Sequence, residues 1–232
     1  MVIFFKNGGI ILYIAIDGPA GAGKSTVARE LAKILKIKYL DSGAMYRAIT
    51  LKVLTTKTDL ENAGALKNLL DNTKLEIVAE EDKSRVFIDG EEVTEAIRSS
   101  EVNGFVSQVS TIPMIRKQLV QLQRDFASEW GSVVMDGRDI GTTVLPDADL
   151  KIYLEASPEE RVNRRFKEYH SKGRNVSSEE VEKELTLRDT IDSERELSPL
   201  EVAPGAIILD TTEMTINEVV KTIADLSGRV KD

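Results

Sequence analysis

A glycine-rich segment near the N-terminus has the residue types needed to hold a chain of phosphates. Residues 18–25 read Gly-Pro-Ala-Gly-Ala-Gly-Lys-Ser and match the pattern G-x-x-x-x-G-K-S/T. The three glycines permit backbone conformations closed to other residues, so successive N–H groups can turn toward a phosphate. Lys24 would add a cation at the β- and γ-phosphates, and the Ser25 hydroxyl would ligate Mg²⁺ directly. The alternative is a glycine-rich turn beside a surface lysine. We predict a nucleoside triphosphate site formed by Gly18, Pro19, Ala20, Gly21, Ala22, Gly23, Lys24, Ser25 and Thr26.

A second charged segment follows an apolar run. Residues 133–139 read Val-Val-Met-Asp-Gly-Arg-Asp. Charge at the carboxyl end of a strand lies where open α/β sheets bind ligands. Asp136 is placed to hold Mg²⁺ through water, and Arg138 is placed to face a phosphate. An ion pair between two loops is the alternative interpretation.

The charges of the chain are unevenly distributed. Its 31 Lys and Arg against 39 Asp and Glu give a net charge of −8, which disfavours general binding to nucleic acid or to anionic membranes. Nine of its fourteen arginines nevertheless lie between Arg116 and Arg195. Because the planar guanidinium group donates two parallel hydrogen bonds to oxyanions, this part of the chain can form a local cationic pocket.

One predicted helix carries charge on its apolar side. Ser177 and Glu180 have the spacing of a capping box that opens this helix. At about 100° per residue, its charged residues fall in the same sector as its apolar ones. Buried charge is costly unless a polar ligand or partner meets it. We predict a row that faces a ligand, with a structural ion-pair network as the alternative, made of Arg188, Asp192 and Arg195 among Val181, Leu185 and Ile191.

The segment from about residue 157 to 178 is predicted to be a mobile lid. It is highly charged and nearly devoid of core residues, and Ser157-Pro158 opens a helix with Glu160 at the spacing of a capping box. Three arginines crowd one side of this helix and suit closure over a triphosphate. An exposed, salt-bridged helix is the alternative. The arginines are Arg161, Arg164 and Arg165.

Alternating strand and helix signals around these motifs predict an α/β fold with a parallel sheet flanked by helices. We expect one phosphate-loop domain over residues 10–232, preceded by an N-terminal extension over residues 1–9. Residues from about 59 to 98 predict a small antiparallel β insertion, with strands at Lys74–Ala79 and Arg85–Ile88. The five predicted core strands are Ile10–Ile16, a brief strand near Tyr39–Leu40, Ser132–Met135, Leu150–Leu154 and Ala206–Leu209.

Composition excludes several classes of chemistry. With no cysteine and one histidine, thiolate metal sites, cysteine nucleophiles and histidine-rich zinc sites are excluded or improbable. The histidine, His170, lies in the charged segment and is expected to be solvated. The longest apolar run, Ile10–Ile16, falls far short of the roughly 20 residues of a membrane span. We expect a cytoplasmic protein, a monomer, with small-molecule substrates and no nucleic acid or membrane partner.

From about Tyr13 to Leu226 the chain resembles the bacterial cytidylate kinases, members of the P-loop nucleoside monophosphate kinase superfamily. The phosphate loop alone would not be specific, but the combination of motifs is. Ser25 departs from some relatives, which carry threonine or glycine at this position. The hydroxyl of Ser25 supports direct ligation of Mg²⁺. The motifs are residues 16–26, Leu40-Asp41-Ser42-Gly43-Ala44-Met45-Tyr46-Arg47, Ser107-Gln108-Val109 with Pro113 and Arg116, residues 136–142, and Arg188-Asp189 with Asp192 and Arg195.

The resemblance implies transfer of the ATP γ-phosphate to CMP or dCMP, in pyrimidine nucleotide metabolism. It implies that Ser107, Arg116 and Asp139 recognise the cytosine edge, with Arg195 close by. Arg188 and Asp192 would engage the pentose, and the monophosphate would be held by Ser42, Tyr46, Arg47 and Arg138. Lys24, Mg²⁺ and the lid arginines are expected to stabilise the transferring group, so the catalytic residues would be Lys24, Arg138, Arg161 and Arg165.

Two other functions stay open at this stage. The first is a P-loop kinase for another small acceptor, such as UMP or shikimate. The second is a nucleotide-dependent switch or regulatory binding protein. A GTPase-type switch would carry an N-K-x-D motif that reads guanine, and the sequence contains none.

Overall fold

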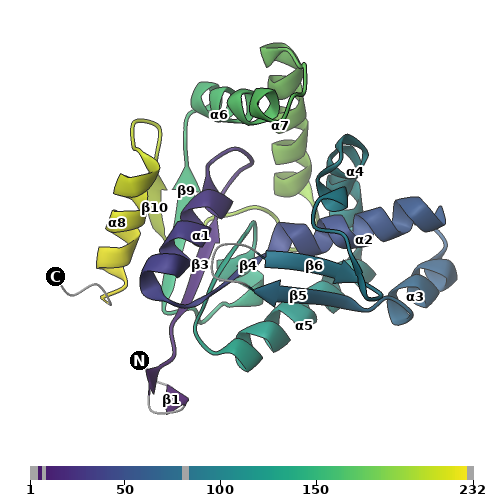
Figure 1. Ribbon diagram of the computed structural model, residues 1–232, viewed down its shortest axis with the longest axis horizontal. Coiled ribbons are helices and arrows are strands. Elements are labelled where there is room, and N and C mark those ends of the chain that lie inside the picture. The colour runs from purple at the N-terminus through teal and green to yellow at the C-terminus, as the bar shows by residue number, and fades with distance from the viewer. Residues whose placement is uncertain (1–4, 7–8, 80–83, 229–232) are drawn as a thin grey trace.

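The centre of the molecule is a five-stranded parallel sheet with the order β10-β9-β3-β8-β4 (Figure 1). The computed structural model describes residues 5–6, 9–79 and 84–228. Each of the five predicted core strands is confirmed, with ends shifted by a few residues. The strands are β3 (Tyr13–Asp17), β4 (Lys38–Asp41), β8 (Val133–Gly137), β9 (Leu150–Glu155) and β10 (Ile207–Asp210).

Helices cover both faces of the sheet because alternate residues of a strand point to opposite sides. In β3, Ile14 and Ile16 pack with α1 (Lys24–Leu35) and α8 (Ile216–Leu226), whereas Ala15 belongs to the core on the other face. That second core is built with α2 (Ser42–Thr56), α4 (Ser100–Ser110) and α5 (Pro113–Trp130). The capping box of Thr215 and Glu218 opens α8. The layered α/β fold predicted from the sequence is confirmed.

The first apolar run is interrupted, although Ile10–Ile16 predicts one continuous strand. The core strand β3 begins only at Tyr13, and β2 (Gly9–Ile10) pairs antiparallel with β1 (Phe5–Lys6). The N–H of Leu12 donates to Ser132 Oγ at 2.9 Å, and the N–H of Tyr13 donates to a carboxylate oxygen of Asp149 at 2.8 Å. These two backbone donors bond side chains instead of a neighbouring strand. The core strand β3 is therefore shorter than the apolar run Ile10–Ile16. The rest of the predicted extension, residues 1–4 and 7–8, lies outside the described residues.

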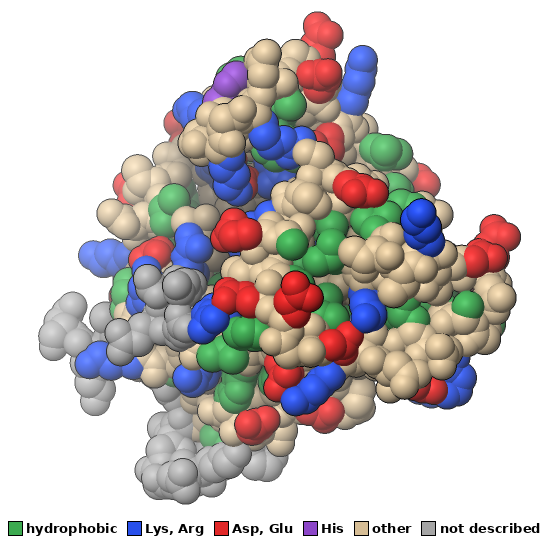
Figure 2. Space-filling model, turned by 45° about the vertical axis from the view of Figure 1, so that its right-hand side comes forward, with side chains coloured by type: hydrophobic (Ala, Val, Ile, Leu, Met, Phe, Trp, Pro, Cys, Tyr) green, Lys and Arg blue, Asp and Glu red, His purple; other side chains and the backbone are tan. Residues whose placement is uncertain are grey.

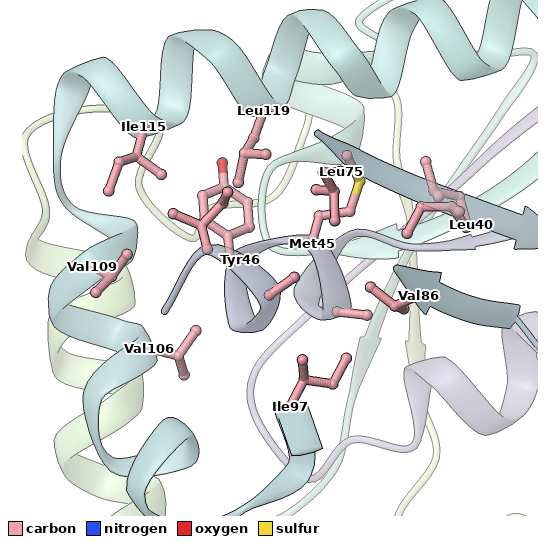
Figure 3. Packing of buried hydrophobic residues seen from close by; sticks show 14 of the residues in the cluster. Leu40, Met45, Tyr46, Leu75, Val86, Ile97, Val106, Val109, Ile115 and Leu119 are labelled. Atoms are coloured by element: carbon pink, nitrogen blue, oxygen red, sulfur yellow. The ribbon is translucent and has the colours of Figure 1, made fainter. Parts of the chain in front are cut away.

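The segment predicted as an insertion folds into a helix and a three-stranded antiparallel sheet. Its apolar side chains join the core around α2, where Leu75, Val86 and Ile97 lie beside Met45 (Figure 3). The connection between the two predicted strands includes residues 80–83, which lie outside the described part of the chain. The division of the chain into domain and insertion stays a prediction. The elements are α3 (Ala63–Asp71), β5 (Leu75–Ala79), β6 (Ser84–Ile88), β7 (Glu91–Glu92) and the 3₁₀ turn η1 (Ala96–Arg98).

Helices α6 (Pro158–Ser171) and α7 (Ser178–Glu194) stand together at one end of the molecule (Figure 1). As predicted, the lid segment contributes few residues to a core, and Tyr169 is the buried residue of α6. Tyr169 is buried and forms a small apolar cluster with residues of α7 and the phosphate loop, so α6 packs through one side. The cluster contains Ala20, Tyr169, Val181 and Leu185, with Val162, Phe166 and Val176 packed against it.

The caps of these two helices differ. The predicted capping box of Ser177 and Glu180 is confirmed in α7. In α6 the Ser157 hydroxyl accepts from the Glu160 N–H at 3.2 Å, but the Glu160 carboxylate bonds Arg164 and Asn163 instead of completing the box. The difference arises because the Arg164 guanidinium group binds the carboxylate that would otherwise accept from the Ser157 N–H. Within the described ranges, no helix has the length and apolar character that would let it cross a membrane.

Candidate active site

The phosphate loop connects the end of β3 to the start of α1. Gly18 has a φ of 147°, and a Cβ there would lie 2.0 Å from the Leu154 carbonyl oxygen of β9. Gly21 and Gly23 have φ values of 79° and 87°, which other residues rarely adopt. The glycines therefore let the chain turn tightly against the sheet. This arrangement agrees with the predicted phosphate site.

Lys24 is buried at the first turn of α1. Its Nζ donates to the Pro19 carbonyl oxygen at 2.6 Å, which folds the side chain back across the loop. Burial, followed by the positive charges of Arg138 and Arg188, holds the pKa of Lys24 well below its ordinary value. A polyanion in the loop would offset this repulsion. The site therefore favours a highly charged phosphate ligand.

Asp136, at the carboxyl end of β8, meets residues from two neighbouring elements. One of its oxygens accepts from Ser25 Oγ at 2.7 Å, and the other accepts from the Tyr39 hydroxyl at 2.8 Å. Burial and the nearby carboxylate of Asp41 raise the pKa of Asp136 to about 6. Among the described residues there is no cluster of three or more His, Asp or Glu side chains that could hold a metal. A single carboxylate with a hydroxyl suits an ion that keeps water and phosphate ligands, as Mg²⁺ does.

The loop opens into a cleft of about 910 Å³, and among the described residues that line it Lys and Arg outnumber Asp and Glu. Figure 2 shows Lys and Arg side chains gathered in a hollow below the end of the molecule that carries α6. The outer surface around them is mixed, so the net negative charge of the chain coexists with a locally cationic site. The arginines that line the cleft come from helices α1, α2, α6 and α7, from the turn η1 and from the loop after β8. They are Arg29, Arg47, Arg98, Arg138, Arg164, Arg165 and Arg188.

Beside this cleft, a chain of ion pairs joins the residues predicted to hold a nucleotide base and sugar. Arg116 pairs with Asp139, and Arg195 lies 3.5 Å from Asp139 and 3.6 Å from Asp192. Asp192 also accepts from Arg138 Nε at 2.8 Å. Four of these five side chains are buried, and Arg138 is half-buried. The structure therefore brings together residues from α5, α7 and the loop after β8 that are as much as 79 positions apart in sequence, from Arg116 to Arg195.

Arg188 completes the row predicted on α7. Its Nε lies 4.0 Å from Asp192, and it lines the cleft. Burial and the cation of Arg138 lower the pKa of Arg188 to about 10. The row of Arg188, Asp192 and Arg195 thus combines the two interpretations given above. Its residues form an ion-pair network, and Arg188 also presents its guanidinium group to the cleft.

The other predicted acceptor residues lie around this network on α2 and α4. Ser42 Oγ donates to the Asp136 carbonyl oxygen at 2.6 Å, and Arg47 pairs with Asp41 at 2.9 Å. The Tyr46 ring lies 5.4 Å from the Arg116 guanidinium carbon, and burial raises the pKa of Tyr46 to about 12. Ser107 is buried on α4. In the part of the chain that the structure describes, the buried Tyr46 hydroxyl has no hydrogen-bond partner.

The three lid arginines have different surroundings. Arg164 donates to Thr211 Oγ1 at 3.0 Å, and Arg165 pairs with Glu168 at 2.8 Å while lining the cleft. Arg161 instead pairs with Asp189 and donates to the Ala20 carbonyl oxygen at 3.0 Å. Its guanidinium group therefore ties the phosphate loop to α7 in this conformation. Contact of Arg161 with a transferring phosphate stays a prediction.

Comparison of the sequence with known proteins shows the family of the chain. A sequence model described as cytidylate kinase matches residues 14–229. The cytidylate kinase of Carboxydothermus hydrogenoformans is 49% identical over 219 residues, which cover 94% of this chain and 98% of that protein. The cytidylate kinase of Caldanaerobacter subterraneus subsp. tengcongensis is 52% identical over 210 residues, covering 90% and 92%. The chain belongs to the cytidylate kinase family.

A solved structure supports the fold of this family member. The crystal structure of an uncharacterized protein from Eubacterium ventriosum aligns with a TM-score of 0.50 at 14% identity, covering 94% of this chain and 99% of that one. At this identity the likeness concerns the fold alone.

Sequence reasoning missed three side chains that position the site of this cytidylate kinase family member. Tyr39 reaches Asp136 from β4, and Asp189 receives the Ala20 N–H at 3.0 Å. Asp17, next to the phosphate loop, accepts from the backbone N–H groups of Ile140 and Gly141 at 2.8 and 2.7 Å. Burial raises the pKa of Asp17 to about 6, against these two hydrogen bonds. Asp17 and Asp189 belong to two of the family motifs, residues 16–26 and Arg188-Asp189, which could have indicated them. Tyr39 belongs to a predicted strand but to no motif.

Proposed function

We propose that this chain transfers the γ-phosphate of ATP to CMP or dCMP, giving ADP and CDP or dCDP. The observation that supports this most is the buried network of Arg116, Asp139, Arg195 and Asp192 beside a phosphate loop. Membership of the cytidylate kinase family over nearly the full chain supports the same acceptor. A purely structural network would not need to adjoin a cationic cleft.

The acceptor residues are proposed as the family resemblance implies. Cytosine offers two acceptors, O2 and N3, and an amino donor, which a serine, an arginine and a carboxylate can satisfy. Uracil would present an N3–H and a second carbonyl to the same groups, and each buried mismatch costs ~1–3 kcal/mol. The proposed contacts are Ser107, Arg116 and Asp139 for the base with Arg195 beside them, Arg188 and Asp192 for the pentose, and Ser42, Tyr46, Arg47 and Arg138 for the monophosphate.

For the donor, we propose that residues 18–26 bind ATP. Mg²⁺ would be held directly by Ser25 and through water by Asp136, whose adjoining oxygens fit this hard cation. When bound, Mg²⁺ would neutralise charge on the β- and γ-phosphates. Ser25 and Asp136 lie on different elements, so the chain itself aligns α1 with the end of β8.

Phosphoryl transfer then depends on positioning and electrostatics. An oxygen of the CMP phosphate forms a bond to the γ-phosphorus while the bond to the leaving oxygen of ADP breaks. Lys24, Arg138 and Arg165 would stabilise charge on the transferring group, and Arg161 would hold the loop against α7. Closure of α6 would exclude water, which would otherwise compete as the acceptor. No histidine or cysteine takes part.

The proposed enzyme works in pyrimidine nucleotide metabolism as a cytoplasmic monomer. A coupled assay for ADP, run with ATP, Mg²⁺ and single acceptors, tests the activity. Turnover with CMP or dCMP well above that with UMP or shikimate supports the proposal. Equal turnover with and without any acceptor would favour a nucleotide-dependent switch.

A further inference from the structure

Tyr39 holds one side of the carboxylate that faces the phosphate loop. Its hydroxyl donates to Asp136 Oδ1 at 2.8 Å, while Ser25 Oγ donates to Asp136 Oδ2 at 2.7 Å. The two oxygens of one carboxylate are thus divided between a strand residue and the first turn of α1. All three side chains line the same cleft.

The tyrosine is itself well anchored. It lies on β4, which pairs in parallel with β8 so that Asp41, and not Tyr39, stands opposite Asp136. Tyr39 therefore reaches Asp136 diagonally across the two strands, which is within the span of a long aromatic side chain. Its ring packs against the apolar core beneath α1, and its carbonyl oxygen accepts from Ser84 Oγ at 3.3 Å. A side chain whose ring is packed in the core, on a backbone held in the sheet, can fix the group that it bonds.

This geometry has a direct consequence for the side chain of Asp136. A carboxylate can rotate about its last bond, and this rotation decides the direction in which its two oxygens point. The bond from Tyr39 to Oδ1 leaves Oδ2 directed at Ser25. With Oδ2 held there, the carboxylate and the hydroxyl meet at one place in the cleft.

We propose that Tyr39 is a positioning residue for magnesium, setting the orientation in which Asp136 and Ser25 together receive the ion. The inference rests on the proposed function, because it assigns Tyr39 to the donor half of the same site. Groups that orient the residues around a metal typically change its affinity by about 10- to 100-fold when they are removed. A merely structural tyrosine would stabilise the fold without changing the response to magnesium.

The test compares Tyr39→Phe with Tyr13→Phe. Both substitutions remove one hydroxyl, but the Tyr13 hydroxyl donates to the Ala127 carbonyl oxygen at 3.4 Å, outside the cleft. Calorimetry would measure the Kd of ATP with Mg²⁺ and again with EDTA, without any acceptor. For Tyr39→Phe, we expect the Kd in EDTA to stay within about twofold and the Mg²⁺ concentration for half-maximal turnover to rise about tenfold. The Kd of MgATP should rise, whereas Tyr13→Phe should change none of these values.

Each other result counts against the proposal. An unchanged response to Mg²⁺ in Tyr39→Phe would overturn it, as would an equal loss of ATP binding with and without the metal, because that pattern belongs to a structural role. Asp136→Asn supplies a second test: Tyr39→Phe should add little to the magnesium defect of Asp136→Asn, and full additivity would contradict coupling through Asp136. If the unmodified chain fails to phosphorylate CMP, the proposed function fails, but the ATP measurements still decide the role of Tyr39.

Discussion

Arg138 Nε donates to Asp192 Oδ2 at 2.8 Å, and this bond joins the loop after β8 to helix α7. Burial opposes ionisation of Asp192, but Arg138, Arg188 and Arg195 outweigh it and hold the pKa of this carboxyl below its ordinary value. One carboxylate therefore interacts with three guanidinium groups where the proposed pentose and monophosphate sites meet.

Replacing Asp192 by Asn should weaken use of the acceptor more than use of ATP. The amide keeps the shape of the side chain but leaves the three arginines without their shared anion. Loss of one partner of a buried ion pair typically costs about 3–5 kcal/mol of stability. Steady-state kinetics should show a larger rise in KM for CMP than for ATP, and denaturant unfolding should show the loss of stability. Equal rises in both KM values would contradict the assignment of Asp192.

Arg188→Lys tests whether the planar fork of Arg188 matters beyond its charge. Lysine keeps a cation but cannot donate two parallel hydrogen bonds. We expect KM for CMP to rise about tenfold, the equivalent of one charge-assisted hydrogen bond, while the Kd of ATP stays nearly constant. Arg124→Lys is the matched control, because Arg124 donates to the carbonyl oxygens of Val144 and Thr143, outside the cleft. A comparable change in both variants would argue against a role of Arg188 in the site.

The lid arginines should separate in kinetics because their surroundings differ. Arg165 lines the cleft, so Arg165→Ala should lower kcat by about 100-fold with a small change in KM, as expected for loss of a group that acts in the transition state. Arg161 bonds Asp189 and Ala20 of the phosphate loop, so Arg161→Ala should mainly raise KM for ATP. Initial-rate kinetics with both substrates varied would measure each effect. The reverse pattern would restore Arg161 as the arginine that contacts the transferring phosphate.

The dependence of kcat/KM for ATP on pH should report the protonation of Asp136. Because burial and Asp41 raise its pKa to about 6, the free enzyme should lose kcat/KM for ATP as the pH falls through about 6, where the carboxylate takes up a proton. Mg²⁺ and the proton compete for the same group, so higher Mg²⁺ should shift this limb to lower pH. Asp17 also has a pKa of about 6, but it bonds backbone N–H groups and should not respond to Mg²⁺. A limb that stays fixed at all Mg²⁺ concentrations would exclude Asp136 as its source.

Local patterns were sufficient to predict the parallel core. The buried run before the phosphate loop and the alternation of strand and helix signals after it depend on neighbours within a few residues, as does the capping box at Ser177. The break before Tyr13 was missed because it depends on Asp149, 136 positions away. The packing partners of the lid were not predicted for a similar reason: Tyr169 is buried by residues of α7 and by Ala20.

The site shows the same division. The phosphate loop is one continuous motif, so its chemistry could be read from residue types and spacing. The partner of each charged group could not, because pairs such as Arg161 with Asp189 and Arg116 with Asp139 form only through the tertiary fold. Tyr39 reaches Asp136 through the pairing of β4 with β8, and no motif in the sequence specifies that register.

The discrimination between CMP and UMP tests the central claim most directly. The measurement is the ratio of kcat/KM for the two acceptors at saturating ATP and Mg²⁺. With at least one buried mismatch of ~1–3 kcal/mol against uracil, the ratio should lie at about 5 or above in favour of CMP, and dCMP should also be accepted. A ratio near 1, or a preference for UMP, would contradict recognition of cytosine by the network of Arg116 and Asp139.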